Sequence, residues 1–165
     1  MAGDASFDVV SDFDRQELVN ALDQARREIQ TRYDFKGVTA QIELGKDELT
    51  IVTDDEYKAK AIRDLIESKA IRRNLSLKIF DWGSIDPAGG NKVRQTVTLR
   101  RGLPEDLAKK ISKLIREEFP KTKPQIQGDA VRVTGKSKDE LQKVIARLRQ
   151  EGEGYPVALQ FENYR

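Results

Sequence analysis

The chain has 165 residues, of which 38% are hydrophobic and 7% aromatic, enough for one ordinary domain or two small ones. It contains no Cys and no His, which excludes a disulfide framework, a thiolate metal site and Ser-His-Asp or Cys-His catalysis. No apolar run approaches the roughly 20 residues of a membrane helix, and MAGDASFD at the start lacks a secretory signal. We therefore expect a cytoplasmic protein with no cofactor, no metal site and no membrane partner.

The charged residues are unevenly distributed along the sequence. Residues 1–85 carry 13 Lys and Arg against 17 Asp and Glu, whereas residues 86–165 carry 17 against 11. A basic half is typical of a chain with a polyanionic partner. A solvated surface whose helices differ in charge is the alternative explanation.

The first half contains alternating patterns typical of strands and apolar stripes typical of helices. We expect, in chain order, a strand at 6–11, a helix from the capping box at 14–17 to about residue 32, a hairpin of strands at 38–44 and 48–53, a helix after the capping box at 53–56, and a strand at 75–80.

Residues 81–91, DWGSIDPAGGN, are rich in Gly, Asp and Pro and are predicted to be a linker. The same order of elements then repeats. We expect a strand at 93–100, a helix that begins near Pro104, a hairpin of strands at 124–127 and 130–135, a helix after the capping box at 137–140, and a strand at 155–161.

Each half therefore reads strand-helix-strand-strand-helix-strand, which is the ferredoxin-like or split βαβ arrangement. We predict an α+β protein of two tandem βαββαβ domains with antiparallel sheets, residues 1–85 and the more basic residues 86–165. Each domain is small, so the halves are expected to pack together or to exchange an outer strand.

The segment RYDFKG distinguishes the two halves. Residues 29–40 of the first half align with only residues 118–124 of the second, so the fold can make this connection without RYDFKG. Planar side chains beside cations suit a ligand made of a base and a phosphate. A helix end closed by Gly37 and covered by Phe35 is the structural alternative. The candidate nucleotide-binding residues here are Arg32, Tyr33, Phe35, Lys36 and Gly37.

A second basic group lies in residues 126–140, where Arg132 and Lys136 precede the N-terminus of a helix and could contact phosphate. An ordinary hairpin with a solvated basic edge is the alternative. The strands at 48–53 and 130–135 carry no aromatic residue, so stacking on the sheet, as in RNA-recognition motifs, is not expected. Tyr164 and Arg165 are further candidates for contact with a ligand.

Three further segments are long and distinctive: QELVNALDQARREIQTRYDFKG (16–37), IQGDAVRVTGKSKDELQ (126–142) and LQFENYR (159–165). On these segments, the chain from residue 6 to its end resembles the YajQ family of bacterial proteins. The resemblance implies two ferredoxin-like domains related to RNA-binding folds. It also implies nucleotide binding, with nucleic acid and cyclic di-GMP as proposed ligands. No catalytic activity or set of binding residues comes with it.

The sequence thus predicts a non-catalytic protein that binds a nucleotide or nucleic acid, either RNA of the tRNA type or a cyclic dinucleotide, through phosphate contacts and limited stacking. A regulator that responds to cyclic di-GMP and binds a protein or DNA partner is the alternative. An enzyme acting on nucleotides is less favoured, because there is no His and no convergent set of carboxylates.

Overall fold

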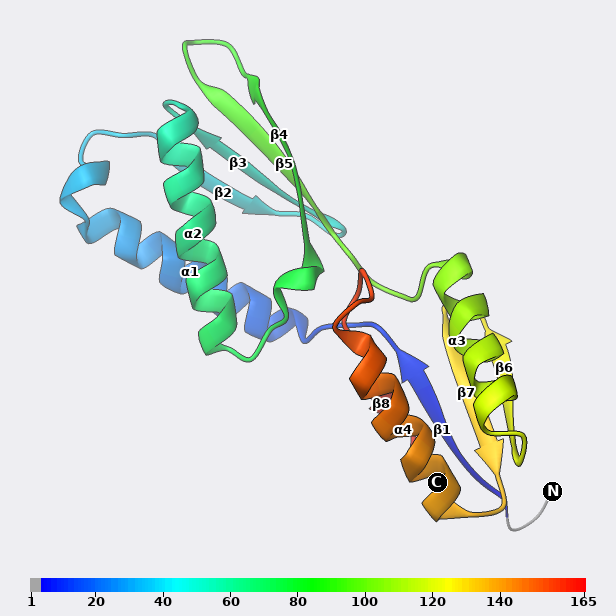
Figure 1. The fold of residues 1–165 in the computed structure, drawn as a ribbon. Coiled ribbons are helices and arrows are strands. Elements are labelled where there is room, and N and C mark those ends of the chain that lie inside the picture. The colour runs from blue at the N-terminus through cyan, green and yellow to red at the C-terminus, as the bar shows by residue number, and fades with distance from the viewer. Residues whose placement is uncertain (1–3) are drawn as a thin grey trace. The chain divides into compact units, whose positions relative to one another are not determined.

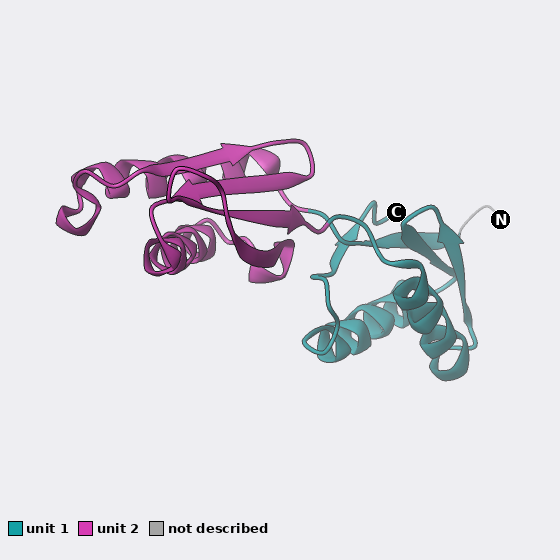
Figure 2. Ribbon diagram, turned by 90° about the horizontal axis from the view of Figure 1, so that it is seen from above, with its two compact units in different colours: residues 1–12, 101–165 teal, residues 13–100 magenta. Residues whose placement is uncertain are grey.

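The computed structural model describes residues 4–165, which form two compact units (Figure 2). Unit 1 combines the N-terminal residues up to Asp12 with Arg101–Arg165, and unit 2 is Phe13–Arg100. The chain therefore passes between the units twice, after Asp12 and after Arg100. Unit 2 is an insertion between the first strand of unit 1 and the rest of that unit.

Unit 1 has the βαββαβ order that the sequence predicts (Figure 1). Its elements are β1 (Ala5–Val10), α3 (Glu105–Glu118), β6 (Thr122–Gln127), β7 (Ala130–Gly135), α4 (Lys138–Gly152) and β8 (Gln160–Glu162). The strands form an antiparallel sheet in the order β6-β7-β1-β8. The core of the unit includes Phe7, Val9, Ile111 and Leu148, all of which are completely buried.

Unit 2 has the same spatial arrangement with a permuted order of elements. These are α1 (Arg15–Thr31), a 3₁₀ turn η1 (Tyr33–Phe35), β2 (Ala40–Leu44), β3 (Glu48–Thr53), α2 (Glu56–Arg72), a 3₁₀ turn η2 (Leu77–Ile79), β4 (Phe80–Pro87) and β5 (Val93–Leu99). The antiparallel sheet runs β2-β3-β5-β4. The last strand, β5, thus occupies the inner position that the first strand, β1, has in unit 1.

The prediction of tandem antiparallel α+β domains is confirmed, but the units do not divide the chain at residue 85. Two inner strands belong to the opposite half from the one expected: β1 pairs with β7 and β8, and β5 pairs with β3 and β4. Physically, an inner strand contributes two rows of hydrogen bonds and one face of the core, so its position determines which residues form a unit.

Residues 81–91 are not a linker. They supply most of β4 and the turn that leads to β5. The residues that suggested a linker have other roles: Pro87 ends an edge strand, where its missing N–H is tolerated, and the turn residues Gly89, Gly90 and Asn91 have positive φ angles of 72°, 59° and 59°. Gly83 lies where the β4–β5 register shifts. The turn-forming residues of this segment therefore belong to the long β4–β5 hairpin.

Smaller differences concern the ends of elements. The segment predicted as a strand at 75–80 forms η2 and joins β4 only at Phe80. The strand predicted at 155–161 is reduced to β8. α1 and α4 are capped by Asp14 and Ser137 as expected, whereas α2 is capped by Asp55 and not by Thr53.

The uneven charge of the two sequence halves is not a property of the units. Unit 1 has 14 Lys and Arg against 13 Asp and Glu, and unit 2 has 16 against 15. Three acidic residues before Phe13 join unit 1, and three basic residues between Lys92 and Arg100 join unit 2. Any attraction for an anion must therefore come from local groups of side chains.

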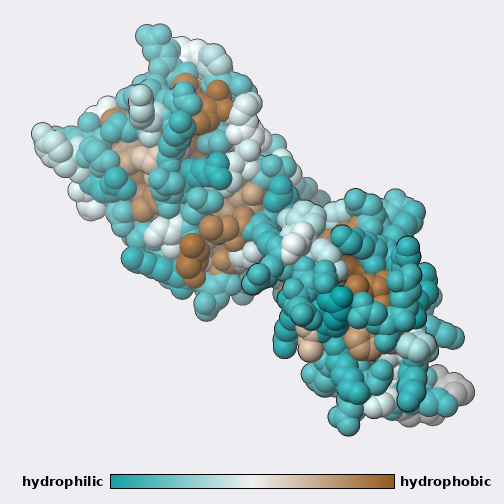
Figure 3. All heavy atoms as spheres, viewed as in Figure 1, coloured by the Kyte–Doolittle hydropathy of each residue, from teal (hydrophilic) through white to brown (hydrophobic). Residues whose placement is uncertain are grey.

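Hydrophilic residues cover most of the face shown in Figure 3, and apolar residues form separate areas on it. This fits the concentration of apolar side chains in two cores, one in each unit. Within residues 4–165, no helix combines the length and the apolar character needed to span a membrane.

Candidate functional site

The RYDFKG segment forms a short anchored turn after α1. The helix ends at Thr31, and the Arg32 N–H donates to the Glu28 carbonyl at 2.9 Å. The η1 turn follows, closed by hydrogen bonds from Phe35 N–H to Arg32 O and from Lys36 N–H to Tyr33 O. Gly37 then adopts φ = 75°, a left-handed conformation that residues with a side chain rarely take.

Phe35 anchors the turn to the core of unit 2. Its side chain is 4% exposed and packs in the same cluster as residues of α1, α2 and the sheet. The Arg32 guanidinium lies 5.4 Å and the Lys58 ammonium 5.2 Å from the centre of the Phe35 ring. Phe35 therefore has a structural role, because its ring offers no free face to a ligand.

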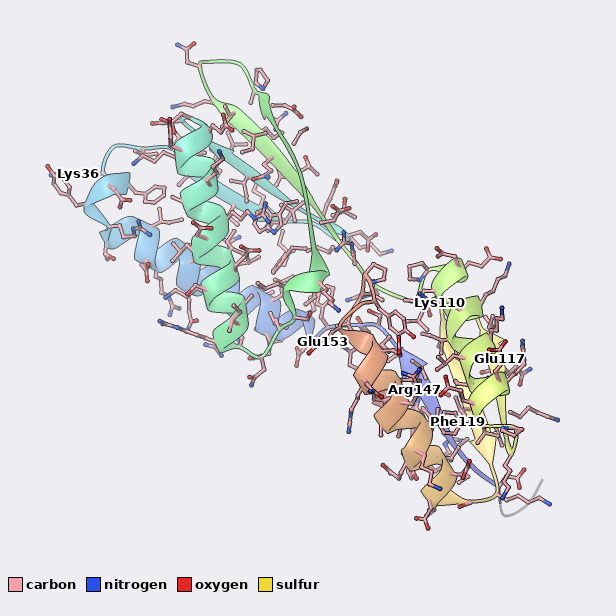
Figure 4. The ribbon with its side chains drawn as sticks, viewed as in Figure 1. Lys36, Lys110, Glu117, Phe119, Arg147 and Glu153 are labelled. Atoms are coloured by element: carbon pink, nitrogen blue, oxygen red, sulfur yellow. The ribbon has the colours of Figure 1, made fainter. Side chains whose placement is uncertain are left out.

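Tyr33 and Lys36 project from the anchored turn. Tyr33 is 89% exposed, the highest value among the large hydrophobic residues that the structure describes. Lys36 is also exposed and extends away from the helices at the tip of the loop (Figure 4). An exposed aromatic ring beside a lysine on a fixed turn is an arrangement that can stack a base and attract a phosphate.

Arg32 is partly neutralised by its neighbours. Its guanidinium donates to both carboxylate oxygens of Asp34, at 3.0 and 2.8 Å, and lies 3.8 Å from Glu28. The hydrogen bonds from Arg32 hold the pKa of Asp34 below its usual range. This pairing stabilises the turn, so Arg32 contributes to the local positive charge less than its formal charge suggests.

The candidates from the second half lie in unit 1 and are largely engaged in structural contacts. Arg132 on β7 donates to Asp8 on β1 at 2.9 and 3.3 Å. The Tyr164 ring stacks against Phe7 at 6.4 Å, and the Arg165 N–H donates to the Ser6 carbonyl at 2.9 Å. Lys136 is exposed in the turn before α4.

The structure thus separates the predicted site residues into two groups. Arg32, Tyr33, Phe35, Lys36 and Gly37 form one continuous turn in unit 2. Arg132, Lys136, Tyr164 and Arg165 belong to unit 1 and line its sheet and C-terminal segment.

Lys58 and Tyr57 at the start of α2 were not identified from the sequence. The Lys58 ammonium donates to the Asp34 carbonyl of the turn, and Tyr57 is 84% exposed. The contact of Lys58 with the turn depends on the packing of α1 against α2. The one sequence signal was the capping box at 53–56, which places both residues in a first helical turn.

Among residues 4–165, no group of three or more carboxylates could hold a metal ion.

A family described as "Nucleotide-binding protein YajQ-like" matches the chain over residues 5–165. The chain belongs to this family. Among its relatives, a nucleotide-binding protein of Chloroflexus aggregans is 59% identical, and those of Trichormus variabilis and Roseiflexus castenholzii are 56% and 55% identical. Each alignment covers 165 residues and the full length of both chains. The resemblance to the YajQ family seen in the sequence is confirmed.

Proposed function

We propose that this member of the YajQ-like family is a non-catalytic, cytoplasmic protein that binds a nucleotide or nucleic acid at the RYDFKG turn. The observation that carries the proposal is the 89% exposure of Tyr33 on a turn that the buried Phe35 holds in place. Relatives named nucleotide-binding protein support the general class of ligand.

In this site Tyr33 would supply a stacking face, and Lys36, Lys58 and Arg32 would supply positive charge. Stacking of a base on an aromatic side chain contributes about 1–3 kcal/mol, with little dependence on sequence. Phosphate contacts of exposed lysines add affinity that falls with salt. The expected ligand is therefore recognised by its phosphates and an unpaired base, as in a single-stranded RNA segment or a cyclic dinucleotide.

β3, β5 and β7 carry no aromatic residue, and Phe7 of the remaining inner strand, β1, is completely buried, which supports this location over the open sheet. β3, β5 and β7 present Glu, Thr, Val, Arg and Ala on the faces away from the helices. Lys136 remains a proposed additional phosphate contact in unit 1. Arg132 is a weaker candidate, because Asp8 already occupies its guanidinium.

Substitution of Tyr33 by Ala tests the proposal. We expect the affinity for a fluorescent single-stranded oligoribonucleotide to fall by between about 5-fold and 150-fold. The melting temperature should not change, because the side chain contributes little to the core. Tyr33→Phe is the matched control and should bind normally, since it keeps the ring.

Unlabelled cyclic di-GMP added as a competitor distinguishes the two ligand classes. Displacement of the RNA at moderate salt would indicate a cyclic dinucleotide site, and no displacement would favour an RNA-binding site. Equal RNA affinity of the wild type and Tyr33→Ala would contradict the proposed location.

A further inference from the structure

A groove runs along the helical face of unit 2, between α1 and the C-terminal half of α2, with a volume of about 710 Å³. Polar and charged side chains form all of its lining, which consists of Glu17, Gln24, Arg27, Glu28, Thr31, Lys69, Arg72, Arg73 and Asn74. Four of these residues are cationic and two are anionic. The groove therefore carries a net positive charge within a unit that is nearly neutral.

Both carboxylates in the groove are paired with cations. Glu28 accepts a hydrogen bond from the Lys69 ammonium at 2.9 Å, and Glu17 lies 3.7 Å from Arg73. The hydrogen bond from Lys69 is the main cause of the lowered pKa of Glu28, and the charges of Lys69, Arg32 and Arg72 also lower it. Neither carboxylate forms an ion pair with Arg27 or Arg72.

Among residues 4–165, the side chains of Arg27 on α1 and Arg72 on α2 form no hydrogen bond and no ion pair, although the charge of Arg72 acts on Glu28. The last turn of a helix favours cations, which accounts for Lys69 and Arg72 without a ligand. Arg27 also lines the groove but lies one turn before the end of α1, and this explanation does not apply to it. Guanidinium groups suit phosphate recognition, because each can donate two parallel hydrogen bonds to one phosphate.

In unit 1 a different arginine joins the two helices. Arg147 on α4 reaches across to α3, donates to both oxygens of Glu118 at 2.9 and 3.2 Å, and also bonds Glu151 (Figure 4). These bonds raise the pKa of the Arg147 guanidinium. Arg147 is thus neutralised by carboxylates in unit 1, whereas Arg27 and Arg72 of unit 2 are exposed and form no such pair.

We propose that the groove lined by Arg27 and Arg72 is an anion site that binds phosphate groups of the nucleotide ligand. The inference rests on the proposed function in one respect: Thr31 lines the groove, and the next residue, Arg32, begins the RYDFKG turn. A second hollow of about 340 Å³ is lined by Arg32, Ala61, Asp64, Leu65 and Ser68, and Ser68 precedes Lys69 of the groove. The two sites therefore form one continuous surface along α1 and α2.

The length of this surface indicates how much ligand it can hold. From Lys58 to Arg72, α2 rises by roughly 21 Å at 1.5 Å per residue. That length accommodates the phosphates of several nucleotides, with the base of one of them on Tyr33. A cyclic dinucleotide would occupy only part of the surface, although its phosphates share the same chemistry.

The double variant Arg27→Gln/Arg72→Gln tests the groove against the matched control Arg116→Gln. Arg116 is exposed in the last turn of α3, at the position that the sequence repeat aligns with Arg27. The probes are a fluorescent single-stranded oligoribonucleotide over a salt series, inorganic pyrophosphate and cyclic di-GMP. We expect the double variant to bind the oligoribonucleotide about tenfold more weakly. The slope of log affinity against log salt should decrease by about 1.4, or about 0.7 per lost phosphate contact.

The results separate the groove from the RYDFKG site. Tyr33→Ala should reduce affinity without changing the salt slope, whereas the double variant should change both, and Arg116→Gln neither. If the double variant no longer binds pyrophosphate and cyclic di-GMP, the groove binds the phosphate groups of small ligands. If the double variant binds all three probes like the wild type, the groove is not an anion site, and the proposed role of Tyr33 is unaffected. If the wild type binds none of the three probes, both the anion site in the groove and the proposed nucleotide-binding function are contradicted.

Discussion

Asp8 and Arg132 join the two inner strands of unit 1 through a paired hydrogen bond. The Asp8 side chain is 11% exposed and also accepts a bond from the Asn163 amide at 2.8 Å. The bond from Arg132 is the main cause of the lowered pKa of Asp8, with further contributions from Asn163 and the charge of Arg165. The ionised form is therefore favoured in the folded state.

This pair predicts how the stability of unit 1 depends on pH. Because the folded-state pKa is lowered, the stabilisation is fully present above the unfolded value of about 3.9 and is lost as pH falls through the folded value. We expect the free energy of unfolding of unit 1 to decrease below about pH 4, and Asp8→Asn to flatten that decrease.

The measurement is denaturant unfolding followed by amide resonances of unit 1 between pH 2 and 7. Glu117→Gln is the control, because Glu117 is exposed and lies 4.0 Å from its partner Lys113 on the same helix. An acid dependence that is the same in Asp8→Asn and the wild type would show that other carboxylates control it.

Residue type alone could not assign roles within RYDFKG. Tyr33 and Phe35 are both aromatic and two positions apart, yet one is 89% and the other 4% exposed. The difference arises because α1 stops at Thr31 and the η1 turn rotates Phe35 towards the core. The sequence identified the segment as additional to the fold, whereas the division between anchor and exposed ring depends on backbone geometry.

At the level of elements, apolar stripes placed all four helices to within a few residues. Strands that end or bend were harder to predict, and β4 is the main case. Its bulge lies between Trp82 and Ile85, where pairing with β5 shifts register. The bulge interrupts the alternation of apolar and polar residues on which strand prediction depends.

Gly83 at this bulge is predicted to be essential for the β4–β5 hairpin. A Cβ atom at this position would lie 2.6 Å from the Thr96 carbonyl oxygen of the paired strand, which is closer than real contacts allow. Because the obstacle is backbone, relief requires a shift of the strands. We expect Gly83→Ala to destabilise unit 2 by about 1–3 kcal/mol.

Urea unfolding monitored by the fluorescence of Trp82, the only Trp of the chain, measures this effect within unit 2. Ser84→Ala is the control, because the Ser84 hydroxyl bonds only to the exposed Asp86. Its effect should stay below about 0.5 kcal/mol. Equal midpoints for the two variants would mean that β4 adjusts without cost.

At the scale of the whole molecule, the sequence repeat indicated the right architecture with the wrong partition of strands. Both halves begin with an alternating strand, and either strand fits either sheet by pattern alone. Pairing between β1 and β7 joins residues more than 120 positions apart, which no local signal records. A local signal did exist for β5: Gly89, Gly90 and Asn91 between two strand-like segments are typical of a hairpin turn.

The permuted arrangement predicts which fragments of the chain fold alone. Residues 13–100 contain all four strands, both helices and the complete core of unit 2, so this fragment should unfold cooperatively with native Trp82 fluorescence. Residues 86–165 lack β1, the inner strand that pairs with β7 and β8 and buries Phe7 and Val9. This fragment should remain unfolded, because β8 would have no partner and the core would lose one layer.

Circular dichroism and amide resonance dispersion of the two fragments provide the comparison. A third fragment, residues 101–165 with residues 4–12 joined at its N-terminus through a flexible linker, should regain the fold, because it restores β1 to its place between β7 and β8. Cooperative folding of 86–165 without those residues would mean that another segment, such as β5, can occupy the inner position. The preference of β1 and β5 for their own sheets would then come from the connected chain and not from complementarity of the strands.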